Sequence, residues 1–117
     1  PSTVKFINTE RLSVFKKGAV LINTSRGGLV NEDDLYGALS DGTLAFAGLD
    51  VFANEPYALS GVKDLRKLPN VVLSPHVASH TVAANRRMAA SALKSIELFK
   101  AGRISEIPII PELRPRP

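Results

Sequence analysis

The sequence has no cysteine and no tryptophan among its 117 residues, and aromatic residues make up only 6% of it. Without cysteine, a disulfide framework, a thiolate metal site and a cysteine nucleophile are excluded. No apolar run approaches the roughly 20 residues of a membrane-spanning helix, and no secretory signal pattern is visible. Hydrophobic residues nevertheless reach 44%, a share typical of a folded globular domain. We therefore expect a cytoplasmic globular protein with no membrane partner.

The excess of positive charge is small, because 15 Lys and Arg residues stand against 11 Asp and Glu residues, which gives a net charge of +4. The basic residues form short, scattered pairs, such as Lys16–Lys17 and Arg86–Arg87, and the two tyrosines, Tyr36 and Tyr57, lie apart from these pairs. Surfaces that bind nucleic acid usually combine a basic groove with stacking aromatics. The pattern predicts a mildly basic surface and no nucleic-acid partner, and it also fits attraction to an anionic small molecule.

Three motifs of phosphate and nucleophile sites are missing as well. The sequence contains neither G-x-G-x-x-G nor a P-loop, and it has no G-x-S-x-G elbow. The segment Arg26-Gly27-Gly28 matches none of them. The sequence starts with Pro1 rather than Met, and Pro1–Thr3 is typical of the middle of a loop. We therefore expect a piece of a longer protein.

The apolar periodicity predicts helices that alternate with strands. A continuous apolar run such as Ala19–Ile22 is typical of a strand buried on both faces of a parallel sheet. Alternation of this kind predicts an α/β fold with helices outside a parallel sheet. The predicted helices are Glu10–Phe15 capped by Thr9, Glu32–Leu39 capped by Asn31, and Thr81 to about Ala101; the predicted strands are Ala19–Ile22, Leu44–Asp50 and Val71–Leu73. The segment Asn54–Lys67 is predicted to be a loop with one helical turn.

Charged side chains follow all three predicted strands. Arg26 follows the first strand, Glu55 lies shortly after the second, and His76 follows the third. Because ligands of open parallel sheets bind beyond the carboxyl ends of the strands, these side chains are expected at one edge. Each also has a structural interpretation: a surface arginine before a glycine turn, a loop glutamate, and a buried histidine.

The chemistry of the three side chains is complementary. The guanidinium of Arg26 can hold a carboxylate by two parallel hydrogen bonds. His76 can give or take a proton near neutral pH, and a neighbouring Glu55 would orient the imidazole and favour its protonated form. This set suits a 2-oxo or 2-hydroxy acid. A zinc site at His76 and His80 is disfavoured, because their spacing needs a helix that Pro75 interrupts, and no metal site is predicted.

At these residues the sequence resembles the D-isomer-specific 2-hydroxyacid dehydrogenase family. The resemblance extends from Pro1 to about Gly102 and rests on three ordered blocks: Lys17–Glu32, then Gly48–Phe52 with Glu55-Pro56, then Asn70–Ser79. It implies the C-terminal half of a Rossmann-like doubly wound sheet from a two-domain enzyme. Residues 1–80 would then complete the NAD(P)-binding domain, 81–101 would form a helix crossing toward the substrate domain, and 102–117 would be a Pro-rich tail.

The resemblance also implies roles for individual residues. Arg26 would bind the carboxylate and carbonyl of a small 2-oxo acid, and His76, paired with Glu55, would be the acid in reduction and the base in oxidation. Asp50 would meet the carboxamide of the nicotinamide. The expected contacts of the cofactor, NAD or NADP, are Thr24, Ser25, Arg26, Asp50, His76, Ala78 and Ser79.

The family resemblance leaves two functions open. The first is an NAD(P)-dependent reductase of the glyoxylate/hydroxypyruvate or 2-ketogluconate type, expected to be a homodimer. The second is a dinucleotide-sensing transcriptional corepressor of the C-terminal binding protein type, which shares the architecture and the Arg–Glu–His trio. Because the glycine-rich phosphate turn and most of the substrate domain would lie upstream, the 117 residues alone are expected to be inactive.

Overall fold

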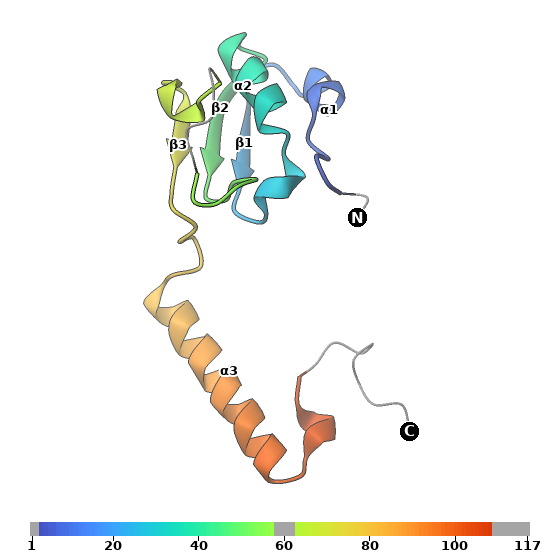
Figure 1. Ribbon diagram of the computed structural model, residues 1–117, viewed down its shortest axis with the longest axis vertical. Helices are drawn as coiled ribbons and strands as arrows, with labels where there is room; N and C mark the ends of the chain where they lie inside the picture. Colours follow the sequence, from blue (N-terminus) through green and yellow to red (C-terminus); the bar gives the residue numbers. More distant parts are fainter. Residues whose placement is uncertain (1–2, 58–62, 109–117) are drawn as a thin grey trace. The chain divides into compact units, whose positions relative to one another are not determined.

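A computed structural model describes residues 3–57 and 63–108 of the chain. The chain divides into two compact units, Pro1–Ala78 and Ser79–Pro117. The first unit holds the three strands and the first two helices, and the second holds the long helix α3 (Figure 1).

The first unit contains a three-stranded parallel sheet in the order β1-β2-β3. The strands are β1 (Ala19–Asn23), β2 (Leu44–Leu49) and β3 (Val71–Leu73). Helix α2 (Glu32–Ser40) connects β1 to β2, and a 3₁₀ turn (Leu65–Lys67) precedes β3. The sequence-based prediction of a parallel α/β sheet with flanking helices is confirmed. Residues 58–62 of the predicted loop lie outside the described part.

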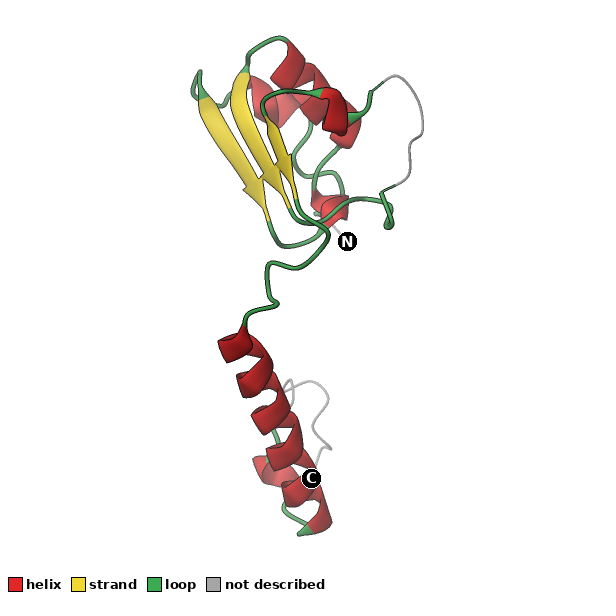
Figure 2. Ribbon diagram, turned by 90° about the vertical axis from the view of Figure 1, so that its left-hand side faces the viewer, coloured by secondary structure: helices red, strands yellow, loops and turns green. Residues whose placement is uncertain are grey.

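Helices α1 (Thr9–Ser13) and α2 lie on one side of the sheet, as Figure 2 shows. Their buried leucines, such as Leu12 and Leu35, form the core together with β2 side chains such as Leu44. The prediction that Thr9 caps α1 is wrong. The cap is Asn8, whose Oδ1 accepts a hydrogen bond from the Arg11 N–H at 3.1 Å. Thr9 instead uses its own N–H to bond Asp34 Oδ2 at 2.9 Å, which ties α1 to α2.

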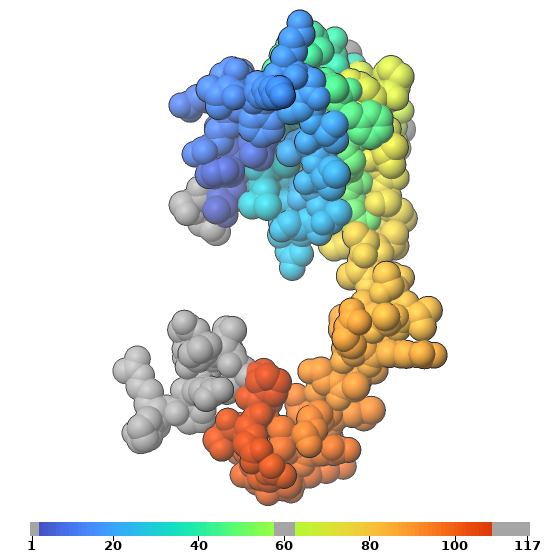
Figure 3. All heavy atoms as spheres, turned by 180° about the vertical axis from the view of Figure 1, so that it is seen from behind, coloured from blue at the N-terminus to red at the C-terminus, as the bar shows by residue number. Residues whose placement is uncertain are grey.

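The opposite face of the sheet carries exposed apolar side chains. Val20 is 55% exposed, Ile22 72% and Val72 59%, and the colours of β1, β2 and β3 lie side by side on this face in Figure 3. The expectation that β1 is buried on both faces is therefore wrong for the described residues. Alternate side chains of a strand point to opposite faces, and the apolar side chains of Ala19 and Leu21 pack toward the helices.

Helix α2 starts at the predicted residue, but without the predicted side-chain cap. Asn31 occupies the N-cap position, but its side chain makes no capping hydrogen bond. The first turn is acidic, with Glu32, Asp33 and Asp34, which is favourable at the positive end of the helix dipole.

The second unit consists of α3 (Val82–Lys100) and a 3₁₀ turn (Ile104–Glu106). Thr81 caps α3, because its Oγ1 accepts a hydrogen bond from the Ala84 N–H at 3.0 Å. Several large apolar side chains of α3 are exposed, as at Leu93 and Phe99. In the described part of the chain, no helix is long and apolar enough to span a bilayer. Residues 109–117 of the predicted tail lie outside that part.

Candidate active site

The three strands end in the same row of the sheet. Asn23 pairs with Leu49, and Leu49 pairs with Leu73. The residues that follow, Thr24, Asp50 and Ser74, therefore leave the sheet side by side, and the loops after the strands share one edge.

The loop after β1 starts with a turn that Asn23 stabilises, and Asn23 is 7% exposed. Its Oδ1 accepts a hydrogen bond from the Ser25 N–H at 3.1 Å, and its Nδ2 donates to the Arg26 carbonyl at 3.0 Å. These bonds fix the backbone on both sides of Thr24 and present Arg26 at the edge. The sequence analysis missed Asn23, although an asparagine that ends a strand and precedes a turn is a typical turn former.

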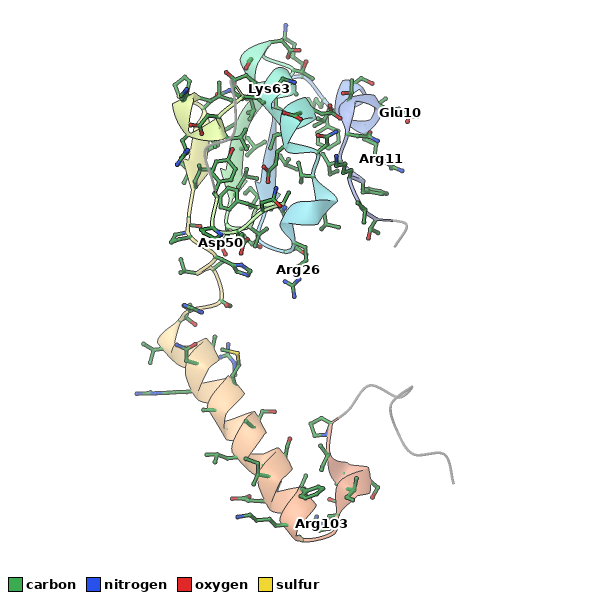
Figure 4. The ribbon with its side chains drawn as sticks, in the orientation of Figure 1. Glu10, Arg11, Arg26, Asp50, Lys63 and Arg103 are labelled. Carbon is green, nitrogen blue, oxygen red and sulfur yellow. The ribbon has the colours of Figure 1, made fainter. Side chains whose placement is uncertain are left out.

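The side chain of Arg26 is exposed and extends away from the sheet, at the same end of the unit as Asp50 (Figure 4). One guanidinium nitrogen, Nη1, donates to the Ser25 carbonyl at 2.7 Å. A guanidinium carries five N–H donors in a planar fork. The remaining donors are enough for a carboxylate ligand.

The loop after β1 and the loop after β2 are in contact at Gly27. A Cβ atom at Gly27 would lie 1.9 Å from the carbonyl carbon of Phe52, so only glycine allows this approach. The contact sets the spacing between the loop of Arg26 and the loop of Glu55.

Glu55 and His76 form a hydrogen-bonded pair, with Glu55 Oε2 2.8 Å from His76 Nδ1. The other carboxylate oxygen of Glu55 accepts the Phe52 N–H at 2.9 Å. The bond from His76, followed by the Phe52 N–H, lowers the pKa of Glu55 below its ordinary value. The pair is accessible, since the side chains are 51% exposed at His76 and 36% at Glu55.

Asp50 is only 4% exposed. Its carboxylate accepts three hydrogen bonds from the loop after β3: from the Ser74 hydroxyl at 2.5 Å and from the Val77 and Ala78 N–H groups at 2.9 Å each. The Ser74 hydroxyl is the main reason why the pKa of Asp50 is lowered, and burial opposes this effect. Asp50 therefore holds the loop that carries His76.

Arg26, Glu55 and His76 line one hollow of about 290 Å³ at this edge. Of the predicted cofactor contacts, Thr24 and Ser25 are exposed in the loop after β1, and Ala78 lies in the loop bonded to Asp50. Ser79 belongs to the second unit. In residues 3–57 and 63–108, no cluster of three or more His, Asp or Glu residues could hold a metal ion.

A second hollow of about 370 Å³ lies against the Glu55–His76 pair. Aromatic side chains contribute to its wall, and the rings of Phe52 and Tyr57 are 4.7 Å apart. The Glu55–His76 pair thus lines both hollows.

A parallel α/β sheet with polar side chains gathered at its carboxyl edge is typical of a domain that binds a nucleotide or another small ligand there. The chain belongs to the D-isomer specific 2-hydroxyacid dehydrogenases, because the model of their NAD binding domain matches residues 1–78. The family resemblance drawn from the sequence is thereby confirmed.

Known proteins of this family are similar over most of the chain. A glyoxylate reductase of Pyrococcus horikoshii is 46% identical over 102 residues, which are 87% of this chain and 30% of that protein. The D-isomer specific 2-hydroxyacid dehydrogenase of Lactobacillus delbrueckii, in its NAD complex, superposes with a TM-score of 0.76 at 37% identity, covering 87% of this chain and 34% of that one.

The NADPH-dependent glyoxylate/hydroxypyruvate reductase of Sinorhizobium meliloti, in complex with NADP and malonate, has a TM-score of 0.73 at 42% identity, covering 84% of this chain and 30% of that one. The chain thus spans about a third of the length of the relatives that it matches.

Proposed function

We propose that the protein is an NAD(P)-dependent oxidoreductase that reduces small 2-oxo acids of the glyoxylate/hydroxypyruvate type to D-2-hydroxy acids. The observation that carries this proposal is the single hollow lined by Arg26, Glu55 and His76. The names of the similar proteins, glyoxylate reductase and glyoxylate/hydroxypyruvate reductase, support the substrate class.

The residues of the hollow divide the work of the reaction. Arg26 binds the substrate carboxylate and polarises the neighbouring carbonyl oxygen. His76 gives that oxygen a proton in reduction and takes it back in oxidation. Because Nδ1 of His76 is bonded to Glu55, Nε2 is the nitrogen that meets the substrate, and the carboxylate of Glu55 stabilises the imidazolium.

The same edge fits the nicotinamide end of NAD or NADP. Thr24 and Ser25 offer exposed hydroxyl and backbone groups there, and we assign Ala78 and Ser79 to the side of the ring. Asp50 can still accept the carboxamide N–H₂, since each carboxylate oxygen has two acceptor positions. When bound, the reduced cofactor supplies the hydride that reaches the carbonyl carbon.

Replacement of Arg26 or His76 by alanine in the full-length protein tests the proposal. Each variant is expected to lose at least about 100-fold in kcat/KM for glyoxylate or hydroxypyruvate. This is the usual loss on removing an acid–base group such as His76 or a cationic donor at the reacting oxygen such as Arg26. Binding of the cofactor, measured by nucleotide fluorescence, is expected to stay within about threefold, because remote contacts supply most of the cofactor's binding energy.

Arg11→Ala and His80→Ala serve as matched controls, since they remove the same residue types from exposed positions outside the hollow. Near-normal turnover in His76→Ala would rule out the proposed role of His76.

Two further parts of the proposal concern the whole protein: it is a homodimer, and it resides in the cytoplasm. Both are supported by the family resemblance. Light scattering of the full-length protein and fractionation of the cells that produce it test them.

A further inference from the structure

The loop that carries His76 has an uncommon backbone conformation. The φ angle of His76 is 56°, in the left-handed region that residues other than glycine seldom adopt. Such a conformation persists only where neighbouring contacts determine it. The contacts that hold this loop therefore also fix the direction of the imidazole.

These contacts converge on the carboxylate of Asp50. Ser74, two residues before His76, donates its hydroxyl to Oδ1, and Val77, directly after His76, donates its N–H to the same oxygen. Ala78 donates its N–H to Oδ2. We call the Asp50 carboxylate and these three donors the Asp50 clamp. It fastens the chain on both sides of His76.

Ser74 also connects the clamp to the sheet. Its N–H donates to the Leu49 carbonyl at 2.9 Å and so continues the pairing of β2 with β3. Its carbonyl accepts the His76 N–H at 3.1 Å. The hydroxyl of Ser74 is the one side-chain donor in the clamp, so it is the donor that a substitution can remove.

We propose that Ser74 is a positioning residue for His76, acting through the Asp50 carboxylate to hold the imidazole against Glu55. The inference rests on the proposed function of His76 as the acid of the reaction. Ser74 contacts Asp50 and the backbone rather than the substrate, so its effect reaches the chemistry only through the loop.

Because Asp50 is charged, the positioning role of Ser74 is expected to change the pH dependence of the activity. The titratable groups that face Asp50 are His76 and Glu55. The Ser74 hydroxyl is the largest cause of the lowered pKa of Asp50, so its removal raises that pKa toward the ordinary value. Asp50 is then protonated at a higher pH, and the clamp weakens there. A general loss of stability would instead lower activity equally across this range.

The test compares Ser74→Ala and Ser74→Thr in the full-length protein. Ser74→Ala is expected to lower kcat about 10- to 100-fold, the scale of a misplaced catalytic group, with a smaller change in KM. Its activity is also expected to fall off at a higher pH on the acid side. Ser74→Thr, which keeps the hydroxyl, is expected to restore most of the turnover.

Ser40→Ala is the matched control, because it also removes a hydroxyl that donates a hydrogen bond. The acceptor there is the Tyr36 carbonyl in α2, and Ser40 lines neither hollow. If Ser74→Ala does not fold, Ser74→Cys, a weaker donor, is expected to give an intermediate kcat. Unchanged kcat and pH profile in the folded variants would overturn the proposal.

A second measurement needs no turnover. Hydrogen exchange of the Val77 and Ala78 amides is expected to become faster in Ser74→Ala and to stay slow in Ser74→Thr. If the wild-type protein reduces no 2-oxo acid, the proposed function fails, and the exchange rates alone test the Asp50 clamp. Faster exchange in Ser74→Ala supports the clamp, and unchanged exchange overturns it.

Discussion

The pairing of Glu55 with His76 gives the site a carboxylate that stays ionised in mild acid. Its pKa is lowered mainly by the bond from His76. A carboxyl group with a lowered pKa stabilises the fold above its unfolded-state pKa, and this contribution is lost as the pH falls through the folded-state value. The pair should therefore remain intact at pH 5 and weaken only below the ordinary range of a glutamate, about pH 4.

Glu55→Gln is expected to lower kcat for 2-oxo acid reduction by about 100-fold, because the imidazole loses the anion that orients it. The measurement is kcat in the full-length protein. A kcat equal to that of the wild type would contradict the role given to Glu55.

At the residue scale, the sequence predicted Arg26 and the Glu55–His76 pair, and it missed the side chains that shape the loops around them. Arg26, Glu55 and His76 could be found because each follows a strand. Asn23 and Ser74 could not be assigned in the same way, because their partners are set by the turn geometry and by the register of the sheet. Ser74 and Asp50 are 24 residues apart in the sequence.

At the scale of elements, the order of helices and strands and the parallel sheet followed from the apolar pattern. The strand Val71–Leu73 was predicted to the residue. The cap of α1 was not, because Asn8 and Thr9 are both good capping residues and only the contact with Asp34 distinguishes them. The burial of β1 was also predicted wrongly, since an apolar run does not reveal what covers each face.

Gly27→Ala tests the close approach of the loops that follow β1 and β2. The added Cβ would collide with the backbone of Phe52, so the variant is expected to lose about 1–3 kcal/mol of unfolding free energy, the usual cost of overpacking. Chemical denaturation measures this loss.

Gly28→Ala is the stability control for that experiment, because no heavy atom lies within 4 Å of its added Cβ. Equal stability of the two variants would show that the loops of Arg26 and Phe52 can separate freely.

At the scale of the whole molecule, the described chain exposes two apolar surfaces: Val20, Ile22 and Val72 on the sheet, and Met88, Leu93, Ile96 and Phe99 on α3. Surfaces of this kind mark sites of contact with other protein segments. Exposed apolar surfaces are expected in a chain that spans only about a third of the length of its relatives.

A polypeptide of these 117 residues alone is therefore expected to show no measurable reduction of glyoxylate with NADH or NADPH, since it contains no G-x-G-x-x-G turn for the cofactor phosphates. It is also expected to bind a hydrophobic dye more strongly than the full-length protein does. Normal turnover by the short polypeptide would refute this expectation.

The contact between Gly27 and Phe52 has a practical consequence for altering this protein. The Ala53 N–H also donates to Glu32 Oε1 at 2.7 Å, which fastens the loop after β2 to the start of α2. Residues 26–32 and 51–55 thus form one interlocked piece. An experiment that replaces one of these segments with that of a relative would therefore have to replace the other as well. Either segment alone would lack the contacts that determine its conformation.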